Sequence, residues 1–491
     1  MFFSFLSRKA HPLADPQETR QVAARLASAE PVAALDEIAA WGASVMADPQ
    51  LRPAEKGGLL DTLAGMAQPH LTLIADDFHQ AAGLRLQPPP HKWRAARDYC
   101  QARFQNLAAL LEALERDGKA LPEPAQARLI AQLVRAGADA LKWERFHYGG
   151  ADAPAWACLG RAYQMARQRQ VHGQAVRLEG GATTVRREFL RALALEASAL
   201  DCLLPPQMEL ADRLIGRFVG SFLLTGTAKG QSTHWIDLSA LAAPRRVALH
   251  PEPSPHLRFF SAVPALEPLA ELRCQFELGG LPQELGLSGV LADPEVVRPT
   301  FRHLLTYWSC TAPMRRHRRY GAGAASLDVV GGLHQVHSRL CGNALAGANA
   351  GQGWTLTDVS RGGAGLDAPP ATEWLRVGSL IGLQPNQDGD WMVGVVRRLR
   401  RQPDQRAHIG VQALSPRAVP LVADIGGNRV DALLLDAPQA NGDVRVVLQI
   451  AAYRAATPLH FRVRGESLRV EPLELLESGP DYEVGRYRVA A

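Results

Sequence analysis

The chain has 491 residues and a formal net charge of +5, enough for about two to four domains with their own hydrophobic cores. Hydrophobic residues make up 47% and charged residues 21%, a balance that excludes a disordered chain and a membrane protein. The six cysteines form no CxxC pair, which argues against a zinc site or a disulfide framework and favours free thiols in the cytoplasm. No uncharged apolar run reaches the roughly 18 residues of a transmembrane helix, so we expect no membrane-spanning segment.

Residues 15 to about 225 have the pattern of an all-α region. Asp15 followed by Pro16 is typical of a helix start, since aspartate caps free N–H groups and proline fits the first helical position. Between residues 93 and 114, apolar residues spaced by three or four predict one buried stripe on a long helix that ends near Gly118. The stripe consists of Trp93, Ala96, Cys100, Phe104, Leu107, Leu111 and Leu114. Similar patterns at 19–47, 124–145, 155–170, 184–202 and 207–222 predict about six to eight helices in all.

One of these helices, from Trp156 to Tyr163, has the spacing W-x2-L-G-x2-Y found in the first helix of a tetratricopeptide repeat. No second copy is visible, so we favour an ordinary helix of an irregular bundle. Either interpretation gives a helical surface suited to a protein partner.

Residues 226–311 predict a mixed segment, with proline-rich extended chain at 244–256 and a helix starting at Asp293-Pro294. After residue 312 the pattern is that of β-strands, and Asn441-Gly442 between two apolar runs predicts a hairpin. His334 and His337, three residues apart in this strand context, lack an acidic or thiol partner and predict no metal site.

Positive charge is concentrated between residues 312 and 418, where thirteen arginines and no lysine stand against seven acidic residues. The rest of the chain is close to neutral, so this local patch indicates an anionic ligand. Arginine in place of lysine favours planar, bidentate recognition of that ligand.

Two motifs lie in this segment. Arg315 and Arg319 form RxxxR, and Asp358, Ser360 and Gly363 form DxSxxG further along the chain. The runs Gly-Val-Val at 394–396 and Gly-Val-Gln-Ala at 410–413 then follow as strands. With these motifs in this order, residues 312–418 resemble the PilZ family of cyclic di-GMP receptors.

The resemblance implies a β-barrel that binds cyclic di-GMP, with no cofactor, no metal and no catalytic residue. The binding residues that it implies are Arg315, Arg316, Arg319, Asp358, Ser360 and Gly363. The chemistry agrees, because an arginine fork fits guanine N7 and O6 and also pairs with phosphate. Two positions depart from the family's usual pattern, Tyr320 after the second arginine and Gln412 in the closing strand.

We therefore predict a multidomain α+β protein. Its parts are a helical region at 1–225, a mixed region at 226–311, a PilZ-type antiparallel β-barrel at 312–418, and an additional β unit at 419–491.

The leading hypothesis is a cytoplasmic, non-enzymatic effector that couples cyclic di-GMP binding to an unidentified protein partner through the helical region. Such an effector would act in motility, pili, biofilm or exopolysaccharide control. The alternative is a scaffold or adaptor with a degenerate PilZ domain in type IV pilus or flagellar assembly. A nucleic-acid polymer is disfavoured as a partner, because few aromatic residues lie among the arginines to stack on bases.

Overall fold

The protein is represented by a computed structural model. It describes residues 11–84, 88–118, 121–150, 153–240, 242–247, 251–280, 283–311, 317–343, 353–370, 372, 374–385, 390–402, 404, 406–463 and 465–490. The chain divides into two compact units, one made of residues 1–200 and 204–313 and the other of residues 201–203 and 314–491.

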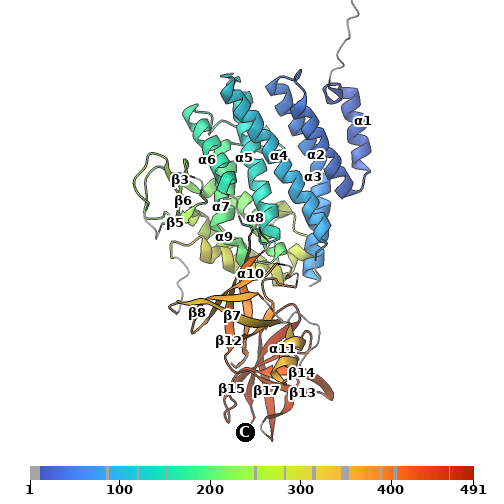
Figure 1. Cartoon of the computed structure of the whole chain (residues 1–491), viewed down its shortest axis with the longest axis vertical. Coiled ribbons are helices and arrows are strands. Elements are labelled where there is room, and N and C mark those ends of the chain that lie inside the picture. The colour runs from blue at the N-terminus through green and yellow to red at the C-terminus, as the bar shows by residue number, and fades with distance from the viewer. Residues whose placement is uncertain are drawn as a thin grey trace, which may run out of the picture. The chain divides into compact units, whose positions relative to one another are not determined.

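Helices dominate the first unit, and α1 to α6 follow one another across it (Figure 1). The helices of this unit are α1 (Pro16–Ala27), α2 (Pro31–Ala47), α3 (Pro53–Gly83), α4 (Pro90–Arg116), α5 (Glu123–Phe146), α6 (Ala153–Gln168), α7 (Val185–Ala197), α8 (Pro205–Phe218), α9 (Leu266–Glu277) and α10 (Pro294–Tyr307). Six of them begin at a proline, which needs no hydrogen-bond partner at that position. The predicted cap of α1 is confirmed, because the Asp15 carboxylate accepts a 2.8 Å hydrogen bond from the backbone N–H of Gln17.

The long helix predicted around residues 93–114 is α4, and every residue of its predicted apolar stripe is buried. Gly118 follows the helix with a φ of +63°, a conformation that costs little without a Cβ atom. The stripe therefore predicted correctly which face of the helix packs into the core.

Short strands complete the first unit. A two-stranded sheet of β1 (Val176–Leu178) and β2 (Gly181–Thr183) separates α6 from α7, where a tetratricopeptide repeat would turn directly into its second helix. The mixed segment contributes a four-stranded sheet in the order β3-β6-β4-β5. These strands are β3 (Leu223–Thr225), β4 (His234–Asp237), β5 (Arg245–Arg246) and β6 (Leu257–Ser261).

The second unit contains two closed antiparallel barrels. The first has the strand order β10-β11-β12-β9-β8-β7 and the second the order β13-β14-β15-β18-β17-β16. The strands of the first barrel are β7 (Tyr320–Gly331), β8 (Trp354–Ser360), β9 (Gly363–Ala368), β10 (Leu380–Pro385), β11 (Met392–Arg401) and β12 (Ala407–Ser415). Those of the second are β13 (Val419–Ile425), β14 (Asn428–Leu434), β15 (Asp443–Gln449), β16 (Leu459–Val463), β17 (Glu466–Ser478) and β18 (Tyr482–Val489). The predicted PilZ-type barrel and the additional β unit are thus both confirmed, and the additional unit is itself a barrel.

One apolar core joins the two barrels. It combines Val393 and Val395 of the first barrel with Leu433 and Val447 of the second, and all four side chains are buried. The barrels therefore pack as one body, so a change at one can be felt by the other.

The strand context predicted for His334 and His337 is wrong, because both lie on a helix, α11 (Leu333–Leu340). Gly332, with a φ of +85°, follows β7 and turns the chain into this helix. Asp481, which lies far along the sequence, accepts a 2.6 Å hydrogen bond from the backbone N–H of Leu333 at the helix start. Such a long-range cap leaves no local signal in the sequence. Among the helices that the structure describes, none combines the length and apolarity that crossing a membrane requires.

Candidate functional site

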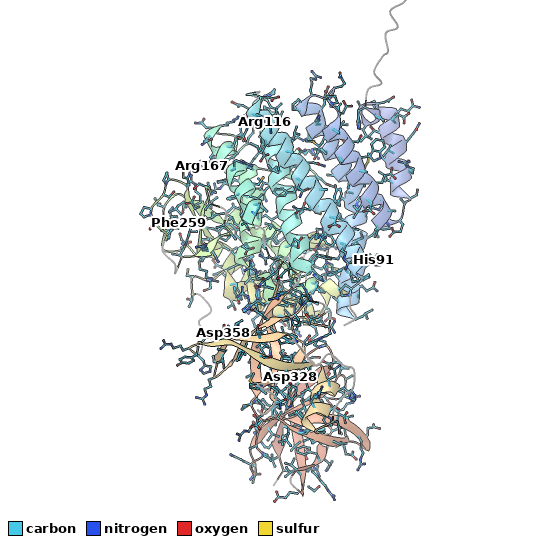
Figure 2. All side chains as sticks on the ribbon, in the orientation of Figure 1. His91, Arg116, Arg167, Phe259, Asp328 and Asp358 are labelled. Carbon is cyan, nitrogen blue, oxygen red and sulfur yellow. The ribbon has the colours of Figure 1, made fainter. Side chains whose placement is uncertain are left out.

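The arginine and aspartate motifs meet on the first barrel. Asp358 lies on β8 (Figure 2), and Arg319 directly precedes β7, which pairs with β8. The Nη1 atom of Arg319 donates a 2.8 Å hydrogen bond to Oδ2 of Asp358 and lies 2.8 Å from Oδ1 as well. The Arg319 side chain is 28% exposed and that of Asp358 is 26% exposed, so the pair sits at the barrel surface with one side open to solvent. The second arginine of RxxxR is therefore already joined to the first residue of DxSxxG.

Irregular strand pairing surrounds this contact. The register between β8 and β9 shifts between Leu356 and Asp358, which makes Thr357 an extra residue on its strand. The register between β7 and β8 shifts between Gly321 and Ala325 at the same level. Bulges commonly re-aim side chains at binding sites, and this one lies next to the motif carboxylate.

Two buried acceptors at this bulge have no hydrogen-bond partner in the described part of the chain, Thr357 Oγ1 and Asp358 Oδ1. Asp358 Oδ1 is close to Arg319 but accepts no hydrogen bond from it. Buried polar atoms are normally satisfied, so this bulge leaves hydrogen-bonding capacity unused among the residues that the structure describes.

The D-x-S spacing has a geometric meaning on a strand. Successive side chains alternate between the two faces, so Asp358 and Ser360 share one face of β8, and Val359 lies on the other. Ser360 Oγ donates a 3.2 Å hydrogen bond to the carbonyl oxygen of Gly363 across the β8–β9 turn. The serine thereby fixes the shape of the turn.

Gly363 is required by close packing. A Cβ atom at this position would lie 1.9 Å from the carbonyl oxygen of Val411 on β12, and its φ is +155°. Only glycine lets the two backbones approach so closely.

The structure also shows residues at this site that the two motifs did not predict. A Cβ atom on Gly365 would lie 2.8 Å from Oδ2 of Asp358 and 2.9 Å from Oγ1 of Thr357, so this glycine makes room for both side chains. A Cβ atom on Gly362 would lie 2.9 Å from the His317 ring, which places that histidine against the turn. The alternating glycines at 363 and 365 were the available signal, since glycine within a strand often marks a close approach.

Of the predicted site residues, Arg319, Asp358, Ser360 and Gly363 are brought together on paired strands and their turn. Arg315 and Arg316 lie outside the described residues.

The two departures from the family pattern now have structural explanations. Tyr320 pairs with Val359, so it lies on the opposite face of the sheet from Asp358 and does not crowd the carboxylate. Gln412 accepts a 2.7 Å hydrogen bond from Nε of Arg397, whose Nη1 and Nη2 atoms each donate a 2.6 Å hydrogen bond to the carboxylate of Glu477 on β17. The glutamine therefore helps to link the site's neighbouring strands to the second barrel.

Two family models match this sequence. The N-terminal domain of the cyclic-di-GMP receptor FimW matches residues 17–229, and the middle PilZ domain of the same receptor matches residues 352–420. The chain therefore contains a PilZ domain. No curated protein and no solved structure matches it significantly.

The PilZ match begins just before β8 and covers the aspartate motif, whereas Arg319 and β7 precede it. The receptor function implied by the two motifs is confirmed at the level of the family, with cyclic di-GMP as a ligand and not a cofactor. The match to the N-terminal domain extends this relationship to the helical region, for which the sequence had predicted no family.

The histidines of α11 lie near acidic and thiol groups that the sequence did not pair with them. Nδ1 of His334 is 3.7 Å and Nδ1 of His337 is 3.9 Å from Oδ2 of Asp431, and Sγ of Cys341 is 3.9 Å from Nδ1 of His337. Within the described ranges, no group of three or more such side chains is arranged to hold a metal ion.

Proposed function

We propose that this chain binds cyclic di-GMP on the β8–β9 hairpin of the first barrel, through Arg319, Asp358, Ser360 and Gly363. Arg315 and Arg316, which precede β7 in the sequence, complete the arginine set. The observation that carries this proposal is the direct contact between Arg319 and Asp358, which joins the two motifs at the paired strands β7 and β8.

The chemistry of the site suits a guanine base. The Arg319 guanidinium can donate to guanine O6 and N7, and the Asp358 carboxylate can accept from the guanine N1–H and N2–H groups. Because Arg319 is held by the carboxylate, less side-chain entropy is lost when the ligand binds. Adenine presents an amino donor where guanine presents O6, so cyclic di-AMP meets a donor facing a donor.

The proposed output is an effector function in which the helical region binds a protein partner. RxxxR begins at residue 315, two residues after the sequence position at which the first unit ends. A ligand bound by these arginines therefore acts on the segment that joins the two units. It can change how the units are arranged only if it binds one arrangement more tightly than another. A non-enzymatic role in the cytoplasm, in control of motility, pili, biofilm or exopolysaccharide, belongs to the same proposal.

Calorimetric titration of the full chain tests this function. We expect saturable binding of cyclic di-GMP, and much weaker binding of cyclic di-AMP, GTP and GMP. The variant Asp358→Ala with Ser360→Ala should lose most of the affinity, whereas Arg400→Ala, an exposed residue of β11, should keep it. Absence of heat and of a thermal shift at high cyclic di-GMP concentration would instead favour a scaffold with a degenerate PilZ domain.

A further inference from the structure

A cleft of about 630 Å³ lies within the helical unit, bordered by α3, α4, α5, α7, α8 and the β1–β2 hairpin. A cleft of this volume can hold a small ligand, but it is far too small to hold a folded domain. Six basic and six acidic side chains line the cleft, so its lining is neutral overall. All of the lining lies in the region that matches the FimW N-terminal domain.

Most of these charges neutralise one another. Arg191 donates two 2.9 Å hydrogen bonds to Asp212 and a third of 2.9 Å to Asp139. Nζ of Lys142 lies 2.7 Å from Oε2 of Glu209 and 2.8 Å from Oδ2 of Asp212. These charges are paired with one another, so we assign the network the structural role of fixing α5, α7 and α8.

Two further charges in the cleft lack close partners. The only ion pair of Arg103 within the described residues is to Asp139, at 3.7 Å, and its guanidinium makes no hydrogen bond although its side chain is only 12% exposed. The half-buried Glu179 carboxylate has neither a hydrogen bond nor an ion pair in the described part, and burial raises its pKa. The charge of Arg103 acts on Glu179, but the two side chains do not meet.

At the rim of the cleft, one positive and one negative side chain also lack a partner among the described residues. Arg187 and Asp76 are exposed lining residues for which the described ranges show no side-chain partner. An unpaired charge that is taken out of water costs free energy, and a counter-charge from a ligand removes that cost.

We propose that this cleft binds a short peptide segment of a partner protein, with a carboxylate of the peptide on Arg103 and a basic group on Glu179. A polyanion would face six acidic side chains, and a simple anion would leave Glu179 unmatched, so a segment with both signs is the ligand that the charges select. This inference rests on the protein partner of the proposed function and assigns that partner's binding site.

Peptide selection on the full-length protein tests the inference. Three libraries of five-residue peptides in an alanine, serine and glycine background are offered to the immobilised protein. One library carries one glutamate and one lysine, one carries two glutamates, and one carries two lysines. We expect enrichment of the mixed library, and the strongest peptide from it is then titrated by calorimetry.

Arg103→Gln and Glu179→Gln should each lower the affinity for that peptide by about tenfold or more, because each leaves a charge of the bound peptide unpaired. Arg103→Lys, which keeps the charge but loses the planar fork, should weaken it less. The matched control is Arg116→Gln at the end of α4 (Figure 2), 13 residues from Arg103 and therefore about 20 Å along the helix.

Thermal melting and a cyclic di-GMP titration accompany each variant. Equal retention of the three libraries, or unchanged affinity in both cleft variants, overturns the proposal if the proteins remain folded. Loss of peptide binding in the cleft variants with intact cyclic di-GMP affinity supports it. Failure of cyclic di-GMP binding alongside normal peptide binding would count against the barrel site and not against the cleft.

Discussion

Replacing Arg319 by alanine should weaken cyclic di-GMP binding far more than it weakens the barrel. A bidentate arginine–guanine contact contributes about 1–3 kcal/mol, which corresponds to an affinity loss of about 5- to 150-fold. The ion pair with Asp358 is roughly one-quarter exposed on each side, so its loss should cost only about 1 kcal/mol of unfolding free energy. The two effects are therefore separable.

The assay combines calorimetric titration with chemical denaturation of the same samples. Arg400→Ala is the matched control, because Arg400 is an exposed arginine of the same barrel with no side-chain partner in the described part. The double variant Arg319→Ala with Asp358→Ala should bind more weakly than either single variant, since each single variant removes a different proposed contact to the guanine base. Wild-type affinity in a folded Arg319→Ala protein would refute the reasoning that the joined motifs form the site.

Three further predictions concern stability. Gly363→Ala should lower the unfolding free energy by more than about 2 kcal/mol, because its Cβ atom would lie 1.9 Å from a carbonyl oxygen of β12. Gly321→Ala, where nothing lies within 4 Å, is its control, and equal stability of the two variants would contradict the packing argument. Glu477→Gln should cost about 1 kcal/mol in denaturation, because its arginine partner joins the two barrels, and an unchanged midpoint would argue against that link. Burial lowers the pKa of His234 from 6.5 to about 3. Between these pH values the unfolded state binds a proton that the folded state does not, so the unfolding free energy falls as the pH drops from about 6.5 to 3. His234→Gln should therefore lose less unfolding free energy than the unmodified protein as the pH falls through this window. An equal loss in the two proteins would contradict the prediction.

Local patterns predicted the elements whose signal is contained within a few residues. The apolar stripe of α4 and the proline starts of α1 and α10 depend only on helical spacing and capping, and each is present as expected. The spacing of Asp358 and Ser360 also has a local meaning, because residues two apart on a strand share one face. These features needed no knowledge of distant partners.

Elements that depend on distant residues escaped prediction. The pattern at 19–47 is divided into two helices, and the 31-residue α3 that follows was not singled out, because its apolar residues do not form a clean stripe. The start of α11 depends on a carboxylate from the loop before β18, almost 150 residues away. The partner of Arg397 lies 80 residues further along, on another barrel. Contacts of this kind are set by tertiary packing and have no signature at either position.

The position of the ligand is the central claim, and hydrogen exchange of the full chain with and without saturating cyclic di-GMP tests it most directly. Ordering of the hairpin around the ligand should slow backbone exchange at 317–320 and at 357–365, and leave the exchange of α3 to α8 unchanged. Protection confined to the helical unit, or no protection of the β8–β9 hairpin in a saturated sample, would contradict the account.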